Sequence, residues 1–425
     1  MPAPLDLDFF CARLSALGAP RRYIVAVSGG PDSMTLARLA AAHQRRGAAR
    51  VLAVTVDHGL RPESRAEAAQ AGDWCRAAGL DHRILVWEGE KPTTGLQQAA
   101  RRARYRLLAA QAAANGFEAV LTAHTADDQA ETVFMRLARG AGPAGLAGMA
   151  ARKMIAAGAA PPVALLRPFL DVSRARARAT LESFGQPWID DPSNDDPAFE
   201  RVRARALLAA LEEQNLLTGE ALRRTAARAR AASLAMRRAE EDAFARAGGC
   251  FYAGGWASVR AEAAAEPGFE AVAARLVRAV SGGDYAPSPE DAAAALAAAR
   301  ASGAATLGGA LLKRRGPALF FLREPAALLG RAGVAPAPAL ALAPGGRALW
   351  DGRFIAENSG GETAQVAALG PEGLAALGPA RALFDAPEEA LLAAPAALFR
   401  GKPGLRLVPL AEERFYDRIL RFPDP

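Results

Sequence analysis

The chain has 425 residues, of which 51% are hydrophobic, and it carries a formal net charge of +7. A chain of this length usually folds around more than one hydrophobic core, so we expect two or three domains. No apolar run is long enough to cross a bilayer, and the first residues lack the basic start and apolar core of a signal peptide. We therefore predict a cytoplasmic protein without a membrane segment. The excess of arginine permits a polyanionic partner such as RNA, although a GC-rich codon bias would explain it equally well.

Residues 22–140 alternate between short apolar, β-prone runs and helical patterns. Strands are predicted near 22–28, 50–57, 82–87 and 118–124, and helices near 32–46, 63–78, 95–115 and 126–139. This alternation predicts a parallel sheet that is covered by helices on both faces. Ligands bind beyond the carboxyl ends of the strands in such sheets, so polar residues at those ends are the candidates for a site.

The composition changes after this region. Residues 141–172 are rich in Gly, Ala and Pro and are predicted to form loops and short extended pieces, whereas residues 173 to about 325 are predicted to be mostly helical. Residues 333–346 have the composition of a linker. We therefore predict an α/β domain over 1–215, a helical domain over 216–332, and a linker with a small mixed module over 333–425.

The stretch from Ser28 to Ser33, Ser-Gly-Gly-Pro-Asp-Ser, joins the first predicted strand to a helix. Asp32 and Ser33 are good N-cap residues, so the helix is predicted to begin at these positions. A helix N-terminus binds anions, and Gly29 and Gly30 would let a phosphate approach the backbone. Asp32 can hold a magnesium ion that binds the same phosphate. An ordinary tight turn is the alternative, and the missing Gly-Lys-Ser/Thr excludes a Walker P-loop.

The second predicted strand ends in Asp57 and His58. An aspartate at this place can bind a nucleotide sugar or a metal, and it can also simply cap the next turn. Because this is the next strand-to-helix loop after Ser-Gly-Gly-Pro-Asp-Ser, we favour a place in the same site.

The fourth predicted strand is followed by a helix whose first turns carry several acids beside His124. Asp128 and Glu131 are three residues apart and share a helix face, and Asp127 lies four residues before Glu131. Acids at a helix start also favour the helix dipole, which is the structural alternative. Their number beside a phosphate site suits binding of magnesium or of an amine substrate.

Three arginine-rich segments allow contact with phosphate or RNA. Arg104 lies with Arg101 and Tyr105 on one face of the third helix, where arginine can pair with phosphate or stack on a base. A later segment places three arginines after an Asp- and Pro-rich loop, and a basic helix follows. Each segment can also be a solvated helix surface, which is the more common case. The candidates for contact with an RNA backbone are Arg201, Arg203, Arg205, Arg223 and Arg224.

Six motifs follow one another in the chain: SGGPDSM, VDHGLRPES, ARRARY, AHTADDQAET, RGAGPAGLAGM and DDPSNDD. Together they resemble the tRNA(Ile)-lysidine synthetase family, within the PP-loop or N-type ATP pyrophosphatase superfamily, over roughly residues 20–210. The resemblance implies a catalytic Rossmann-like PP-loop ATPase domain, followed by a helical domain that binds the tRNA substrate and a small mixed C-terminal module. It also implies a carbon–nitrogen ligase that adenylates carbon 2 of the wobble cytosine of the CAU-anticodon isoleucine tRNA and then attaches free L-lysine.

The resemblance also implies roles for single residues, and a homodimer is compatible with it. ATP would be held by Ser28, Gly29, Gly30, Pro31, Asp32, Ser33, Asp57 and His58, with Asp32 on the magnesium ion. The residues implied in catalysis are Asp32, Arg104, His124, Asp128 and Glu131. The chain departs from the family at Val202, where the family usually has Asn, which weakens the role implied for that basic segment.

The nearest alternative is another PP-loop tRNA-modifying enzyme of the thiolase type. Most such enzymes need paired cysteines for a persulfide or an iron–sulfur cluster. The three cysteines here, Cys11, Cys75 and Cys250, lie far apart. A nonenzymatic RNA-binding protein is the alternative from another class, and the intact acids argue against it.

Overall fold

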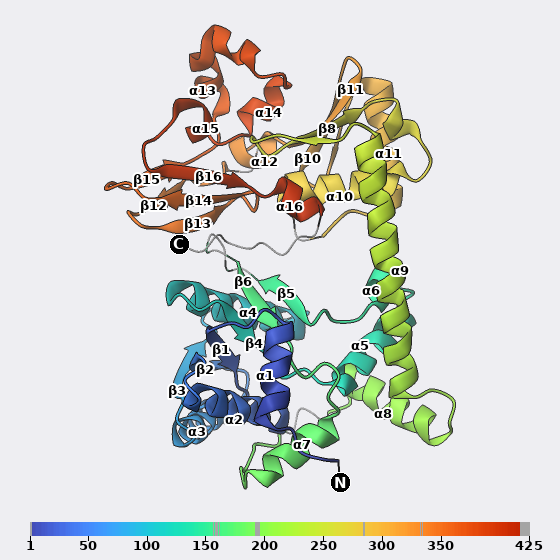
Figure 1. The fold of residues 1–425 in the computed structure, drawn as a ribbon. Coiled ribbons are helices and arrows are strands. Elements are labelled where there is room, and N and C mark those ends of the chain that lie inside the picture. Colours follow the sequence, from blue (N-terminus) through green and yellow to red (C-terminus); the bar gives the residue numbers. More distant parts are fainter. Residues whose placement is uncertain are drawn as a thin grey trace. The chain divides into compact units, whose positions relative to one another are not determined.

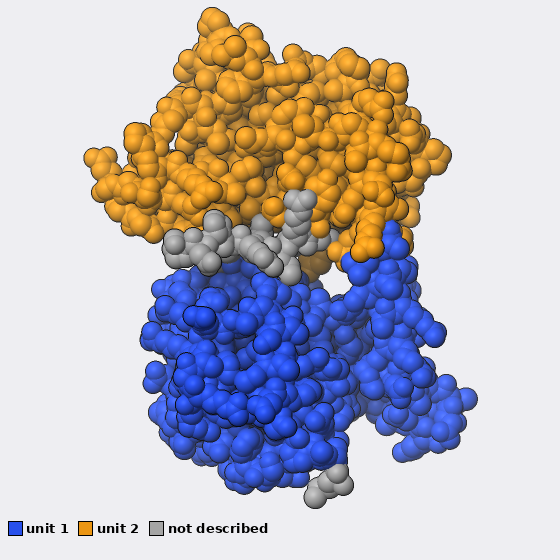
Figure 2. All heavy atoms as spheres, viewed as in Figure 1, with its two compact units in different colours: residues 1–157, 162–235 blue, residues 158–161, 236–425 orange. Residues whose placement is uncertain are grey.

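The structure is a computed structural model that describes residues 2–155, 157, 160, 162–191, 196–283, 285–331, 333 and 335–416. Part of the predicted Asp-Pro-Ser-Asn loop, residues 192–195, lies outside the described residues. The chain divides into two compact units, one of residues 1–157 and 162–235 and the other chiefly of residues 236–425 (Figure 2). The boundaries predicted at 215 and 332 stay predictions.

A six-stranded sheet with the order β3-β2-β1-β4-β6-β5 forms the centre of the first unit (Figure 1). Its strands are β1 (Arg22–Ala26), β2 (Arg50–Asp57), β3 (Asp81–Val86), β4 (Ala119–Leu121), β5 (Arg152–Ile155) and β6 (Val163–Leu166). Neighbouring strands pair in parallel except β5, which is antiparallel to β6 at the edge. The register aligns Val25 with Ala53 and Leu121, so the carboxyl ends of β1, β2 and β4 meet at one edge of the sheet.

Helices cover both faces of this sheet, as predicted. The helices of this part are α1 (Leu7–Ala16), α2 (Pro31–Arg45), α3 (Ser64–Ala77), α4 (Leu96–Ala114), α5 (Ala126–Ala138), α6 (Pro143–Leu146) and α7 (Arg174–Ser183). Alternate residues of β1 enter different cores, because strand side chains alternate between faces. Tyr23 and Val25 pack with residues of α1, α2 and α3, whereas Ile24 packs with Leu108 and Ala112 of α4.

Two further helices, α8 (Glu200–Glu213) and α9 (Gly219–Arg246), follow the sheet. Ala130 and Val133 of α5 pack against Leu222 and Ala226 of α9 in a small apolar cluster. Arg230 of α9 also donates to the carbonyls of residues 147 and 149, at 2.9 Å each. The first part of α9 is therefore fixed to the helix that carries the predicted acids.

The second unit contains strands that the prediction of mostly helix over 173–325 missed. A five-stranded sheet has the order β7-β8-β11-β10-β9, and the C-terminal part adds a two-stranded and a three-stranded sheet. The strands are β7 (Cys250–Phe251), β8 (Ala257–Arg260), β9 (Ala304–Leu307), β10 (Ala310–Arg315), β11 (Ala318–Arg323), β12 (Leu340–Leu342), β13 (Arg347–Trp350), β14 (Phe354–Asn358), β15 (Ala364–Val366) and β16 (Leu405–Pro409). Short alanine-rich strands such as β9 have no period-2 pattern, so the helical composition around them dominates.

The helices of the second unit pack against these sheets. The helical elements are the 3-10 helix η2 (Ala263–Ala265), α10 (Phe269–Ser281), α11 (Pro289–Ser302), α12 (Ala326–Leu329), α13 (Gly370–Leu377), the 3-10 helix η3 (Gly378–Leu383), α14 (Glu388–Leu392), α15 (Ala397–Arg400) and α16 (Ala411–Phe415). Val272 and Leu276 of α10 share one core with Leu312 and Phe321 of the five-stranded sheet. Within the described part of the chain, no helix is long and apolar enough to span a membrane.

Candidate active site

The loop between β1 and α2 is held by its own side chains. The hydroxyl of Ser33 donates to the carbonyl of Gly30 at 2.9 Å and accepts from the backbone N–H of Ser28 at 3.1 Å. Gly29 has φ +85°, a conformation that side chains disfavour. Its carbonyl accepts a hydrogen bond from the N–H of Ile189 at 2.9 Å. The loop is therefore a fixed turn, supported from the segment before α8.

The start of α2 differs from the prediction by two residues. Gly30 is the N-cap, and Pro31 takes the first helical position. Proline is favoured there because its missing N–H would be unpaired anyway. Asp32 and Ser33, predicted as caps, consequently lie in the first turn of α2, beside the backbone N–H groups that a helix start leaves free for an anion.

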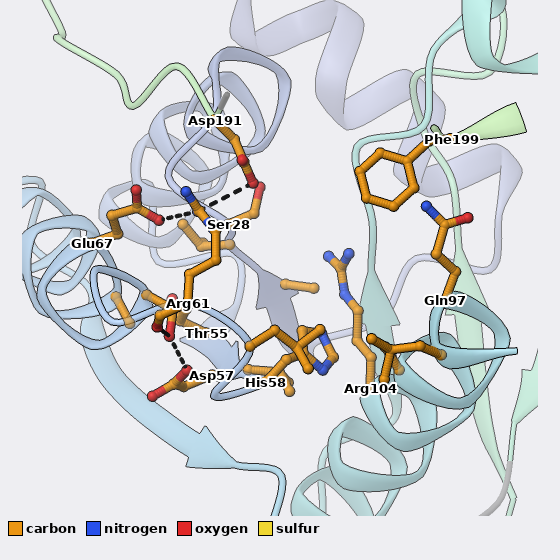
Figure 3. Close-up of a pocket in the computed structure, with 18 of the residues that line it drawn as sticks. Ser28, Thr55, Asp57, His58, Arg61, Glu67, Gln97, Arg104, Asp191 and Phe199 are labelled. Carbon is orange, nitrogen blue, oxygen red and sulfur yellow. Dashed lines mark hydrogen bonds and ion pairs between the residues drawn. The ribbon is translucent and has the colours of Figure 1, made fainter. Parts of the chain in front are cut away.

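A cavity of about 660 Å³ opens beyond the carboxyl ends of β1 and β2 (Figure 3). The ends of both strands, the first half of α4 and the start of α8 form its walls. This volume is typical of a small-molecule site. The predicted site residues that line it are Ser28, Asp57, His58, Arg104, Arg201 and Arg205. Val202, the departure from the family pattern, lines it as well.

Asp57 both caps the following turn and lines the cavity. Its Oδ1 accepts from Gly59 N at 2.8 Å and from Ser64 Oγ at 2.7 Å. His58 meets Trp87 edge to face, with ring centroids 5.9 Å apart. Burial, together with the positive charge of Arg104, lowers the pKa of His58, so the ring is neutral at pH 7.

Arg104 is a cation without a counter-ion in the cavity wall. Its guanidinium extends from α4 between His58 and Gln97 (Figure 3). Within the described residues it has no hydrogen-bond or ion-pair partner, although burial lowers its pKa. Arg61, by contrast, bridges Glu67 at 2.7 Å and Asp191 at 3.4 Å. An unpaired arginine in a cavity wall is a binding group for a phosphate or a polar base edge.

Beside the cavity, three carboxylates and three arginines form what we call the acid–arginine cluster. Its members are Asp32, Asp128, Glu131, Arg174, Arg201 and Arg205. Glu131 lies at its centre with a side chain that is only 3% exposed. It accepts from Arg201 Nε at 2.6 Å, from Arg205 Nε at 2.8 Å and from Arg174 Nη2 at 3.4 Å. A carboxylate this buried needs such partners to stay ionised.

Asp128 combines a structural bond with contacts inside the cluster. Its Oδ2 accepts from the N–H of Thr125 at 2.7 Å, which completes a capping box at the start of α5. Its Oδ1 accepts from Arg174 Nη2 at 3.0 Å and from Arg201 Nη2 at 3.2 Å. Asp128 is therefore both a capping residue of α5 and a member of the acid–arginine cluster.

Asp32 has the weakest pairing of the three acids. Its Oδ2 lies 3.7 Å from Arg174 Nε, and its buried Oδ1 has no hydrogen-bond partner among the described residues. Burial first, and then the charge of Asp128, raise the pKa of Asp32 to about 7, while Arg174 lowers it. An oxygen that is buried and unpaired at a helix start is available for a cation.

His124 lies just before the cap of α5. Its Nδ1 is 2.9 Å from the hydroxyl of Thr122. Burial and nearby arginines, Arg167 foremost, hold the pKa of His124 well below its usual range. The ring is therefore neutral at pH 7 and is a weak proton acceptor.

The five arginines predicted to bind tRNA have different surroundings. Arg201 and Arg205 contact carboxylates of the cluster, and Arg203 donates to the carbonyls of residues 197 and 198. Arg224 is exposed, and its one ion pair among the described residues is with Glu220, one turn away on the same helix. The structure therefore brings the first two to the cavity, and Arg223 and Arg224 lie apart from it on α9.

Sequence reasoning missed Arg174. It stands in the segment RARARATLES, where every second residue at the start is an arginine, and nothing in that pattern separates it from a solvated helix face. The available signal was its place directly after Ser173, which caps a helix that follows a strand of the sheet.

The parallel sheet, the glycine-containing loop at the start of α2 and the cavity at the carboxyl edge define a PP-loop nucleotide-binding domain, and the PP-loop domain family matches residues 10–211. The chain is also similar to curated tRNA(Ile)-lysidine synthases, and the matches to three of them cover different shares of the chain. The one from Bradyrhizobium sp. is 55% identical over 44% of this chain and 51% of its own length. Those from Rhizobium meliloti and Methylobacterium nodulans are 39% and 42% identical, over 80% and 76% of this chain and 74% and 97% of their own lengths.

The chain therefore belongs to the tRNA(Ile)-lysidine synthase family. It uses ATP, as the family of PP-loop enzymes does. The match to the Bradyrhizobium relative spans about half of that protein's length.

Proposed function

We propose that this protein is an ATP-dependent ligase that joins the ε-amine of free L-lysine to carbon 2 of the wobble cytidine of a CAU-anticodon isoleucine tRNA. The observation that carries the proposal is the contiguity of two unlike sites at one sheet edge. A cavity with unpaired phosphate-binding donors adjoins a cluster of carboxylates that can hold an ammonium group. Arg201 and Arg205 belong to both.

The cavity would serve the first step. The triphosphate would lie against the start of α2 and the hydroxyl of Ser28, where backbone N–H groups are unpaired. The carbonyl oxygen of the cytosine attacks the α-phosphorus, and the bond to the β-phosphate oxygen breaks, which releases pyrophosphate. Arg104 would bind the cytosine or the transferred phosphate, because it reaches into the cavity without a partner.

Asp32 fits a magnesium ion that arrives with ATP. Magnesium in nucleotide sites usually takes one or two carboxylates together with phosphate oxygens. The buried, unpaired Oδ1 of Asp32 is such a ligand. No three His, Cys, Asp or Glu side chains in the described part of the chain form a metal site of their own. The ion would neutralise charge on the departing pyrophosphate.

The acid–arginine cluster would serve the second step. The ε-nitrogen of lysine attacks carbon 2, the bond from that carbon to the adenylate oxygen breaks, and AMP leaves. Lysine must first lose its ammonium proton. Both oxygens of Glu131 are engaged by arginines, and the lowered pKa of His124 makes its ring a weak base, so Asp128 or Glu131 would take the proton after exchanging an arginine. Asp128 and Glu131 would then orient the amine.

The first unit carries the charge that tRNA would meet. Residues 1–235 contain 31 Lys and Arg against 24 Asp and Glu, whereas residues 236–425 contain 21 of each. Arg223, Arg224 and Arg228 of α9 belong to the charged part and have no carboxylate of another element as a partner among the described residues. We propose that these side chains contact the tRNA backbone.

Replacing Arg223, Arg224 and Arg228 by Gln should weaken tRNA binding and reduce the slope of log K against log salt by about 2 to 3. Arg230 should be left in place because it holds residues 147 and 149. Replacing the exposed Arg50 of β2 and Arg65 and Arg76 of α3 is the control, because it removes the same number of charges. An unchanged slope in filter binding would make these arginines of α9 a solvated surface.

The proposal is tested with radiolabelled lysine, ATP, magnesium and unmodified isoleucine tRNA with a CAU anticodon. Methionine tRNA, which has the same anticodon, is the control. We expect label in the isoleucine tRNA only, together with AMP and pyrophosphate. Pyrophosphate without label would indicate the same adenylation step followed by attack of another nucleophile. The absence of pyrophosphate under all conditions would refute the proposal that the protein is an enzyme of this kind.

A further inference from the structure

Arg174 contacts carboxylates that come from two different helices. Its Nη2 lies 3.0 Å from Asp128 Oδ1 and 3.4 Å from Glu131 Oε1, both on α5. Its Nε lies 3.7 Å from Asp32 Oδ2 on α2. Among the described residues, it is the cation of the cluster that pairs with all three acids.

The backbone around Arg174 is tied to both of those helices. The N–H of Arg174 donates to Oδ2 of Asp127 at 2.8 Å, and the N–H of Ala126 donates to the carbonyl of residue 172 at 2.8 Å. On the other side, the hydroxyl of Thr35 in α2 donates to the carbonyl of Ala177 in α7 at 2.9 Å. Helix α7 therefore fixes Arg174 between α2 and α5, independently of its ion pairs.

Arg174 differs in this from the other two arginines of the cluster. Arg201 and Arg205 line the cavity. Arg174 is not among the described residues that line it. Arg174 pairs with the acids away from the cavity wall, whereas Arg201 and Arg205 lie where an incoming substrate would meet them. Four carboxylates, counting Asp127, would repel one another without a fixed cation between them.

We propose that Arg174 is a positioning residue that holds Asp32 and the Asp128–Glu131 pair in one arrangement, so that adenylation and lysine transfer both depend on it. This inference rests on the proposed function. Each acid serves one step in that scheme, Asp32 the first and Glu131 the second. Arg174 is not among the described residues that line the cavity, and it would act on both steps through the acids.

The test measures the two steps separately in Arg174→Gln. The first is the rate of pyrophosphate release with tRNA and ATP but no lysine, and the second is transfer of lysine to tRNA that wild-type enzyme has already adenylated. We expect the first rate to fall and the KM for lysine to rise, each by about tenfold or more, which is typical when a supporting partner of a site is lost. Arg174→Lys keeps the charge on one small ammonium and should recover the lysine KM better than the adenylation rate.

Arg178→Gln is the matched control, because Arg178 lies one turn further along α7 and contacts Glu182 and the ring of Trp188 instead of the acids of the cluster. It should leave both steps unchanged. A purely structural role would lower the melting temperature and the active fraction of Arg174→Gln while the lysine KM and the rate per active site stay at wild-type values, and this result would overturn the inference. If Arg174→Gln does not fold, unchanged constants in Arg174→Lys would overturn it equally. Failure of the wild type to transfer lysine refutes the proposed function instead, before any variant is compared.

Discussion

The two halves of the site hold their charge in opposite ways. In the cavity wall, the guanidinium of Arg104 has no hydrogen-bond or ion-pair partner among the described residues. In the acid–arginine cluster, both oxygens of Asp128 and of Glu131 already have partners. The first half is ready for an arriving anion, whereas the second must exchange partners before it can hold an ammonium.

The arginines of α8 belong to both halves of the site. Arg201 and Arg205 occupy the positions around Glu131 that a substrate ammonium would need. They also line the cavity, where phosphate oxygens would offer them an alternative partner. ATP or the tRNA backbone can therefore draw them from Glu131, which couples the filling of one half to the opening of the other. The following experiments separate the two halves.

Asp32→Ala should have the largest effect, because this acid borders both halves. We expect the rate of adenylation to fall by about a thousandfold or more, as when a charge-stabilising group of a transition state is removed. The affinity for tRNA should stay close to that of the wild type, since Asp32 carries no charge that attracts phosphate. Pyrophosphate release and filter binding measure the two quantities, and a parallel loss of both would make Asp32 a structural residue.

Glu131→Gln should affect the second half more than the first. We expect lysine transfer to adenylated tRNA to slow by about a hundredfold, in keeping with the loss of one partner from a buried charged contact. Adenylated tRNA should then accumulate, because Ser28, Asp32 and Arg104, which serve the first step, are unchanged. Chromatography of the tRNA after a single turnover would reveal the intermediate. Equal slowing of both steps would show that Glu131 supports the whole site rather than the amine.

The fold of the first unit was predictable because its local signals agree with one another. The strand predicted over 50–57 matches β2, and the helix predicted over 126–139 matches α5 to within one residue. Apolar runs, glycine turns and polar strand ends all favour the same parallel sheet there. Over 250–323 the alanine-rich composition favours helix, and the strands form through pairing with distant segments that a local pattern cannot reveal.

The candidate site was predictable only where a motif carried it. Ser28 and Arg104 line the cavity at the predicted edge, and Glu131 of α5 lies beside it in contact with Arg201 and Arg205. The partners of Arg201 and Arg205 were not foreseeable, because an arginine-rich helix start looks the same whether it faces water, RNA or a buried glutamate. The role of Arg174 depends on contacts with residues 43 and 46 positions away in the chain. At such a separation, the spacing in the sequence does not indicate the distance in space.

The two glycines of the phosphate-binding loop allow a smaller and sharper comparison. An alanine at position 29 would have to adopt φ +85°, and its Cβ would lie 2.6 Å from Ile189 Cδ1. Gly29→Ala should therefore destabilise the first unit by about 1–3 kcal/mol. A Cβ at Gly30 meets nothing closer than Ser28 Oγ at 3.7 Å. Gly30→Ala should therefore melt like the wild type, and a raised KM for ATP in this variant would report a close approach of phosphate to the backbone. A lower melting temperature for Gly30→Ala than for Gly29→Ala would contradict this account of the loop.

The smallest expected effect is the pH dependence that Asp32 gives to stability. Its pKa is about 7 in the folded chain against an ordinary value of 3.8, so between these pH values the folded state holds one proton that the unfolded state has lost. The corresponding stabilisation is complete below the lower value and is lost as the pH rises through 7. Without magnesium and nucleotide, raising the pH from 6 to 8 should cost the wild type about 1 kcal/mol, or a few degrees in melting temperature, relative to Asp32→Asn. Comparing the two proteins removes the contribution of the histidines to the pH dependence of stability, because the same histidines are present in both. Parallel pH curves would show that Asp32 is ionised throughout this range, and the buried Oδ1 would then need a cation already in the free enzyme.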